Sequence, residues 1–258
     1  MENLNLFDDS DSNYDLDPGL VHYQGELGYF WYNSEEFEII DGPDIGEYLH
    51  YCGKGKSVNL PKGCTNTKYM FSECNLPDGF TLGDKFDTSK VTNMEGMFNR
   101  CNLPADFTLG DKFDTSNVTD MCFMFSGCNL PDGFTLGDKF DTSNVKNMYS
   151  MFIRCNLPSG FTLGDKFDTS NVTDMCFMFS NLPAGFTLGD KFDTSNVRSM
   201  FGMFCNCNLP AGFTLGDKFD TSNVGDMNHM FKRCRYNNIS FREYFKTDDI
   251  KNIIALLK

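Results

Sequence analysis

The sequence has little of what a catalytic or metal centre would need. Its three histidines, His22, His50 and His229, stand in no recognisable nucleophile, metal-binding or acid–base pattern. Its 11 cysteines include no C-x-x-C pair, which is the spacing typical of zinc sites. We therefore expect a protein that is not an enzyme and that holds no cofactor and no metal ion.

Positive charge is missing from the start of the chain. Residues 1–50 contain 13 Asp or Glu and no Lys or Arg. The net charge of the whole chain is −14, which leaves only −1 for residues 51–258. Neither part offers the basic face that a phosphate backbone requires, so we expect no nucleic-acid partner.

Long apolar runs are missing as well. No stretch approaches the roughly 20 apolar residues of a membrane span. The first residues, MENLNLFDDSDSNYDLDPG, lack the positive and apolar regions of a secretory signal. These observations predict no membrane insertion and a cytoplasmic location.

Repetition is what the sequence has in abundance. The tripeptide Asn-Leu-Pro recurs in steps of 27, 27, 27, 25 and 27 residues, starting at Asn75, Asn102, Asn129, Asn156, Asn181 and Asn208. A partial copy, NLPKGCTNTKYMFSEC, precedes them at 59–74. The block GFTLGDKFDTSNV is nearly identical from copy to copy, so the repeats arose by duplication within this chain.

Each copy predicts one strand and one short helix. Phe107 and Leu109 alternate with Thr108, the period of a strand. Ser116 is the expected N-cap of a helix over 117–125. Its apolar stripe is Val118, Met121, Met124, Phe125 and Cys128. Asn-Leu-Pro then ends the helix, because proline cannot continue it.

One unit cannot bury such a stripe alone, whereas stacked units can. We therefore expect an α/β solenoid over residues 59–234, with one partial and six full repeats of 25–27 residues. Its strands would form a short parallel sheet on one side, with a rise of roughly 4.8 Å per coil. The helices would lie on the other side, and both ends would be capped.

The stretch FDTSNVTDMCFMFSGC, residues 113–128, resembles the 26-residue tandem repeat of bacterial surface proteins, the BspA-like, leucine-rich-repeat-related family. The pattern is carried by Phe113, Asp114, Thr115, Ser116, Val118, Thr119, Met121, Met124, Phe125 and Cys128, then by Leu130 and Leu136. The resemblance implies a right-handed, leucine-rich-repeat-like coil, a cell-surface location, and a role in adhesion or partner binding. The usual unit here is 27 residues, one more than in that family.

The two ends differ from the repeats. Residues 1–18 are acidic and predicted to be disordered. Residues 19–58 predict a β-hairpin that turns at Gly-Glu-Leu-Gly and contains Trp31; it is either an N-terminal cap or a small binding domain. Residues 235–258 predict a C-terminal capping helix, since Ile250, Ile253, Ile254 and Leu257 follow helical spacing.

Cysteines and charged residues also recur in register. Six cysteines hold one place at the end of successive copies: Cys74, Cys101, Cys128, Cys155, Cys207 and Cys234. We interpret them as buried, reduced core residues. In GDKFD, Lys112 lies between Asp111 and Asp114. We therefore interpret this stretch as a turn in which the lysine balances the charge of the acids, and not as a calcium site.

Two rows of residues are candidate binding faces. The helix side varies between copies and carries the aromatic residues Phe123, Tyr149, Phe177 and Phe201. The strand side is uniform, with an outward row of Thr81, Thr108, Thr135, Thr162, Thr187 and Thr214. The aromatic residues are the preferred partner-binding candidates, and the threonine row is the alternative.

These features predict a monomeric, non-enzymatic scaffold that binds a protein or glycan partner. The alternative is a structural spacer or particle component whose length is set by the number of repeats. Both functions fit a stack of coils, and the sequence does not choose between them.

Overall fold

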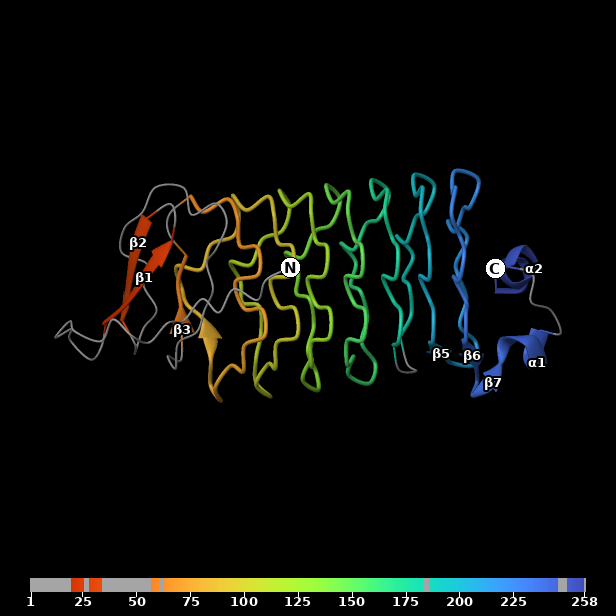
Figure 1. Ribbon diagram of the computed structural model, residues 1–258, viewed down its shortest axis with the longest axis horizontal. Helices are drawn as coiled ribbons and strands as arrows, with labels where there is room; N and C mark the ends of the chain where they lie inside the picture. Colours follow the sequence, from red (N-terminus) through yellow and green to blue (C-terminus); the bar gives the residue numbers. More distant parts are fainter. Residues whose placement is uncertain are drawn as a thin grey trace.

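Successive repeats lie side by side along the long axis of the molecule (Figure 1). The computed structural model describes residues 20–25, 28–33, 57–60, 63–182, 186–245 and 250–257. The regular elements are β1 (Leu20–Gly25), β2 (Gly28–Asn33), β3 (Ser57–Val58), β4 (Thr81–Leu82), β5 (Asn208–Leu209), β6 (Arg235–Tyr236), β7 (Ile239–Ser240), α1 (Phe241–Phe245) and α2 (Ile250–Leu257). The predicted disorder of residues 1–18 falls outside the described residues.

Parallel bridges join each coil to the next. The longest ladder passes through Asn66, Asn93, Asp120, Asn147, Asp174, Ser199 and Asp226. A second ladder joins Asn75, Asn102, Asn129 and Asn156, and their side-chain amides also donate to one another across the coils. We call residues 63–182 and 186–234, which these ladders hold together, the coil stack.

The sheet does not lie where the sequence analysis put it. Among the described residues, pairing at Phe-Thr-Leu is restricted to β3 with β4 and to a bridge between Thr162 and Thr187. The expected alternation is present nevertheless, since Phe107 and Leu109 are buried and Thr108 is exposed. The backbone ladders instead run through the segments where helices were expected.

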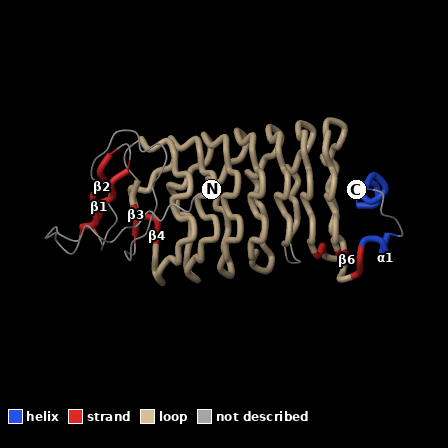
Figure 2. The backbone as a smooth tube through the Cα atoms, viewed as in Figure 1, coloured by secondary structure: helices blue, strands red, loops and turns tan. Residues whose placement is uncertain are grey.

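The short helices expected over 117–125 and its equivalents are wrong. The described coils consist of turns, drawn as loop in Figure 2. Phe123 and Gly127 have φ of 57° and 62°, in the left-handed region that a right-handed helix excludes. Alternate N–H groups therefore donate to the next coil, as Phe123 does to the Tyr149 carbonyl at 2.9 Å, while Met124 donates three residues back to Met121.

The expected N-cap is also wrong. The Ser116 side chain caps no helix; instead its backbone N–H donates to Asp114 Oδ1 at 2.9 Å and closes a turn. Burial acts to raise the pKa of the Asp114 carboxyl, but the hydrogen bonds from Ser116 and the nearby charge of Lys139 together outweigh it and hold this pKa below its ordinary value. The same turn recurs at Asp141 and Asp168.

The core is a set of aligned columns of apolar side chains. One column stacks Phe71, Phe98, Phe125, Phe152, Phe179, Phe204 and Phe231, with ring centroids 5.2–6.0 Å apart. A second column stacks Phe86, Phe113, Phe140 and Phe167. The apolar residues expected in the core, including Val118, Met121 and Met124, are fully buried. Each buried phenylalanine contributes about 1.5–3 kcal/mol.

Buried threonines link the coils inside this core. Thr115 and Thr142 have no exposed surface, and their hydroxyls donate to the Asp141 and Asp168 carbonyls of the next coil at 2.8 and 2.7 Å. Thr88, Thr169 and Thr194 do the same. The threonine of FDTSN is therefore an internal hydrogen-bond donor.

The cysteines in register are free thiols, as the sequence analysis predicted. Cys74 is half-buried, and Cys101, Cys128, Cys155, Cys207 and Cys234 are buried. Burial raises the pKa of Cys128, and the neighbouring Cys155 thiol raises it further. These side chains belong to the core.

The shortened copy at 156–180 is absorbed without breaking the stack. The bridges from Thr162 to Thr187 and from Asp174 to Ser199 run across it. Asn181 has φ of 62°, and its backbone N–H donates to the Cys205 carbonyl of the next coil at 2.8 Å. Gly127 does the same in its own coil, with φ of 62° and a hydrogen bond to the Ile153 carbonyl. Asn181 therefore occupies the left-handed position that precedes the missing cysteine.

Both ends carry structure that differs from the coils. β1 and β2 form the expected antiparallel hairpin, with Gly25 paired to Gly28. At the other end β6 and β7 form a short hairpin that precedes α1, which the single helix expected over 235–258 did not include. Ile253, Ile254 and Leu257 of α2 are buried, as predicted. No helix in the described part of the chain is long and apolar enough to cross a membrane.

Candidate binding faces

The four candidate aromatic residues lie together on the coil stack. Phe123, Tyr149, Phe177 and Phe201 are half-buried and come from four successive coils. Successive ring centroids are 5.2, 6.3 and 5.1 Å apart, and the ring planes meet at 70–81°. We call these four side chains the ring row. It continues to His229, whose ring lies 5.1 Å from that of Phe201.

The ring row alternates between two positions of the repeat. Phe123 and Phe177 occupy the left-handed backbone position, with φ of 57° and 55°. Tyr149 and Phe201 stand one residue earlier in their own coils, and a small residue, Ser150 or Gly202, takes the left-handed position after them. Each ring therefore has a neighbour displaced sideways, which produces the edge-to-face contacts.

Gly202 shows why the small residue is needed. A Cβ at this position would lie 2.5 Å from Cε1 of Phe177. Gly96 has the same relation to Tyr69, at 2.1 Å. The glycines therefore leave the space into which the ring of the preceding coil fits, an arrangement that sequence reasoning missed.

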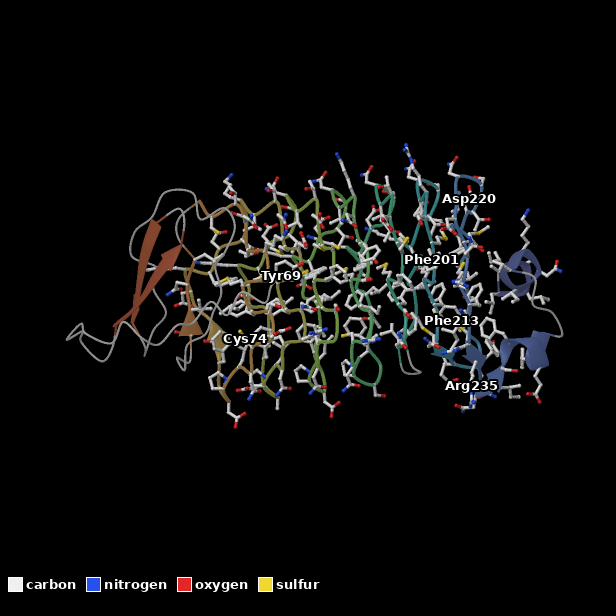
Figure 3. The ribbon with its side chains drawn as sticks, in the orientation of Figure 1. Tyr69, Cys74, Phe201, Phe213, Asp220 and Arg235 are labelled. Atoms are coloured by element: carbon white, nitrogen blue, oxygen red, sulfur yellow. The ribbon has the colours of Figure 1, made fainter. Side chains whose placement is uncertain are left out.

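Charged groups bound the ring row at its N-terminal end. Glu95 takes the place of the ring in the coil before Phe123, and it accepts a hydrogen bond from the Tyr69 hydroxyl at 2.8 Å. Lys68 pairs with Glu95 at 2.7 Å. Burial and the Glu95 carboxylate raise the pKa of Tyr69, which therefore stays protonated. Figure 3 shows Tyr69 and Phe201 at similar height on the coil stack.

The threonine row is exposed along its whole length. Its members are Thr81, Thr108, Thr135, Thr162, Thr187 and Thr214. The row is chemically uniform, as expected, and offers hydroxyls at regular intervals. Few backbone bridges join these threonines to one another, so their side chains are aligned without a continuous β-sheet beneath them.

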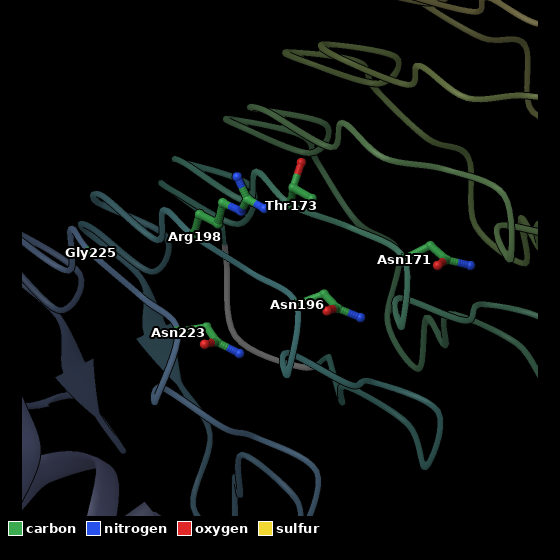
Figure 4. Close-up of a pocket in the computed structure, with 6 residues that line it drawn as sticks. All are labelled: Asn171, Thr173, Asn196, Arg198, Asn223 and Gly225. Atoms are coloured by element: carbon green, nitrogen blue, oxygen red, sulfur yellow. The ribbon is translucent and has the colours of Figure 1, made fainter.

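A polar groove of about 560 Å³, which the sequence analysis did not single out, lies beside the Thr-Ser-Asn turns of three successive coils (Figure 4). It is lined by Asn171, Thr173, Asn196, Arg198, Asn223 and Gly225. Each asparagine donates its amide to a serine carbonyl of the preceding coil at 2.7 Å. The amide oxygens are therefore fixed in orientation and can accept hydrogen bonds from a hydroxylated ligand.

Nothing in the described part of the chain resembles a metal centre. No group of three or more His, Cys, Asp or Glu among these residues could hold a metal ion. The buried thiols are unsuited to nucleophilic chemistry, because burial raises their pKa and keeps them protonated.

The chain belongs to a family defined by sequence. It matches the family described as Mycoplasma protein of unknown function, DUF285, over residues 65–158 and again over 161–258. The two matches together cover most of the chain and confirm its tandem repetition. No curated protein and no solved structure gives a significant match.

Proposed function

We propose that this chain is a non-enzymatic scaffold that presents the ring row to a protein or glycan partner. The observation that carries the proposal is the continuous edge-to-face contact of Phe123, Tyr149, Phe177 and Phe201 across four coils. Aromatic side chains supply large, rigid contact areas and are enriched in binding interfaces. In this chain they interrupt an otherwise monotonous repeat.

We extend this proposal to a role at the cell surface. The motif at 113–128 resembles that of BspA-like surface proteins, a likeness that supports adhesion as the purpose of the scaffold. The stacked coils and their parallel bridges support a right-handed solenoid related to leucine-rich repeats. The surface location and this fold class are both parts of the proposal.

A glycan partner has a further observation in its favour. The groove beside Asn171, Asn196 and Asn223 offers fixed amide oxygens, and Thr173 and Arg198 lie on the adjacent row (Figure 4). Sugars are recognised by such polar groups together with aromatic rings. A protein partner would use the ring row alone.

The test compares two variants of the full chain on immobilised matrix proteins and polysaccharides. Replacing Phe123, Tyr149, Phe177 and Phe201 with serine should weaken binding at least about 30-fold, the loss expected for aromatic hot spots. Replacing the six threonines of the threonine row with valine should leave affinity within about threefold. Circular dichroism and thermal unfolding confirm that each variant is folded.

The opposite pattern would transfer the function to the threonine row. Full binding by the serine variant together with loss in the valine variant therefore contradicts the proposal. Absence of binding by the unaltered chain would favour the alternative, a structural spacer. The spacer has one observation in its favour, namely that the contacts between coils are nearly the same throughout the stack.

A further inference from the structure

The two ends of the chain carry opposite charge. Residues 1–50 hold 13 acids and no base. Residues 228–258 hold seven bases (Lys232, Arg233, Arg235, Arg242, Lys246, Lys251 and Lys258) against three acids, a net charge of +4. The proposed scaffold function makes no use of this polarity.

A cavity of about 480 Å³ lies at the basic end, between the last coil and α2. Its apolar wall is formed by Phe231, Phe241, Ile250 and Ile253, and its polar rim by His229, Lys232 and Arg233. Arg235 of β6 follows the lining residue Cys234, is exposed, and lies at the same end of the molecule as α1 (Figure 3). Arg233 and Arg235 form no ion pair with any residue that the structure describes.

The same end exposes apolar side chains. Among the described residues, the large apolar side chains with the most exposed surface are Ile239, Tyr244 and Leu256, at 38%, 46% and 61%. All three come from β7, α1 and α2. Exposed large apolar side chains at one end of a molecule mark a surface that another chain can cover.

We propose that this basic end binds the acidic N-terminal segment, residues 1–19, of a second copy of the chain. That segment interleaves Asp8, Asp9, Asp11, Asp15 and Asp17 with the apolar residues Leu4, Leu6, Phe7, Tyr14 and Leu16. Its carboxylates match Lys232, Arg233 and Arg235, and its apolar side chains match the cavity wall. Arginine in particular pairs with carboxylates through two parallel hydrogen bonds.

The placement of the ends selects a second copy as the occupant. β1, which directly follows the acidic segment, lies at the opposite end of the coil stack from α1 and α2 (Figure 1). To reach its own cavity the segment would have to run back along the whole stack. Asp15 and Asp17 lie five and three residues before Leu20 and extend at most about 17 and 10 Å from it, so they cannot cross a stack whose coils rise roughly 4.8 Å each. Two copies placed end to end bring the acidic and the basic ends together directly. Such a head-to-tail contact does not close on itself and extends into a linear chain. The sequence analysis expected a monomer, which is the competing outcome of the test.

The test uses two complementary variants of the full chain. The tail variant carries Lys232→Glu, Arg233→Glu and Arg235→Glu. The head variant carries Asp8→Asn, Asp9→Asn, Asp11→Asn, Asp15→Asn and Asp17→Asn. In analytical ultracentrifugation at low salt, the unaltered chain should form oligomers that grow with concentration and dissociate when salt is added. Each variant alone should be monomeric.

Mixing a tail variant with a head variant gives the decisive measurement. The tail variant still has an intact acidic segment and the head variant an intact basic end, so one contact can form. The mixture should therefore give a 1:1 dimer and nothing larger. A control with Lys139→Glu, Lys166→Glu and Lys191→Glu has the same net charge as the tail variant and should still form oligomers.

Three results would overturn the proposal. The first is an unaltered chain that stays monomeric at every concentration, which is also the result expected if the segment binds its own cavity. The second is a tail variant that oligomerises as the unaltered chain does. The third is a mixture that forms no dimer although both variants unfold like the unaltered chain. The four-serine variant of the ring row should still oligomerise, so this test and that of the proposed function fail separately.

Discussion

Single backbone positions decide whether the ring row can exist. A ring can occupy the left-handed position of one coil only if the same position in the next coil holds a small residue. Phe177 followed by Gly202 satisfies this requirement, and Tyr69 followed by Gly96 does as well. The variation between copies on this side of the coils is therefore partly dictated by packing.

Gly202→Ala tests this requirement. The new Cβ would lie 2.5 Å from the Phe177 ring, so the ring must move. Gly216 is the matched control, because it also has positive φ, 78°, but a Cβ there would meet nothing within 4 Å. We expect Gly202→Ala to lower the free energy of unfolding by about 1–3 kcal/mol more than Gly216→Ala, as overpacking does. Equal losses in urea denaturation would show that the ring moves aside without cost.

The buried thiols predict a loss of stability in alkali. Burial holds the pKa of Cys128 above its ordinary value of 9.0, and it acts on Cys155 in the same direction. Below pH 9 both the folded and the unfolded thiols are protonated, and their contribution is fully present. Above it only the unfolded thiols ionise, so each such cysteine lowers the free energy of unfolding by about 1.4 kcal/mol per pH unit.

The measurement is the slope of unfolding free energy between pH 8.5 and 10. A variant with Cys128→Ala and Cys155→Ala should show a shallower slope than the unaltered chain, whatever its absolute stability. Parallel slopes would mean that these thiols ionise in the folded protein. The same thiols should resist alkylation until the chain unfolds.

At the scale of the element, the coil is built from turns that hydrogen-bond to their neighbours. Apolar spacing of three and four residues predicted helices, but this spacing equally suits a run of turns that bury the same residues. The deciding information is the left-handed backbone at positions such as Phe123 and Arg154, neither of which is a glycine. Non-glycine residues adopt that conformation rarely, so the sequence gives little warning of it.

Other parts of the coil could be read from the sequence. The repeats themselves could be recognised directly. The sequence also predicted which repeat positions are buried, namely those of the phenylalanines, methionines and cysteines, and that the threonines of the threonine row are exposed. The C-terminal helix followed from helical spacing, whereas Asn-Leu-Pro, expected to end a helix, carries the second bridge ladder at its asparagine. The sideways alternation of the rings could not be predicted, because it depends on which coils are neighbours and on the precise backbone position of each ring.

Thr142→Val tests the internal link between coils. The Thr142 hydroxyl is fully buried and donates to the Asp168 carbonyl at 2.7 Å. Its loss leaves a buried acceptor unpaired, which costs about 1–3 kcal/mol. Thr135→Val, at the exposed threonine of the same coil, should change stability by less than about 0.5 kcal/mol. Equal effects in a chemical denaturation experiment would contradict this assignment of the two threonines.

At the scale of the whole molecule, the coils should act as additive units. Deleting residues 129–180 removes two complete repeats and joins Cys128 to Asn181. We expect a folded protein whose urea m-value falls by roughly two-sevenths, because the m-value follows the surface exposed on unfolding. An unfolded product would show that the coils are not interchangeable. A spacer would keep its function after this deletion, whereas binding through the ring row should fall sharply.

The alternation of the rings gives the molecule a second period, which is twice the first. The sequence repeats after one copy, but the ring row repeats only after two, since Phe123 is equivalent to Phe177 and Tyr149 to Phe201. Loss of residues 129–155 would set Phe123 beside Phe177 in the same position and destroy the edge-to-face contact. Loss of residues 129–180, two copies, would set Phe123 beside Phe201 and restore it. The surface of this chain is thus sensitive to parity: it can lengthen or shorten by pairs of repeats and keep its pattern, and a change by an odd number leaves a fault in the row.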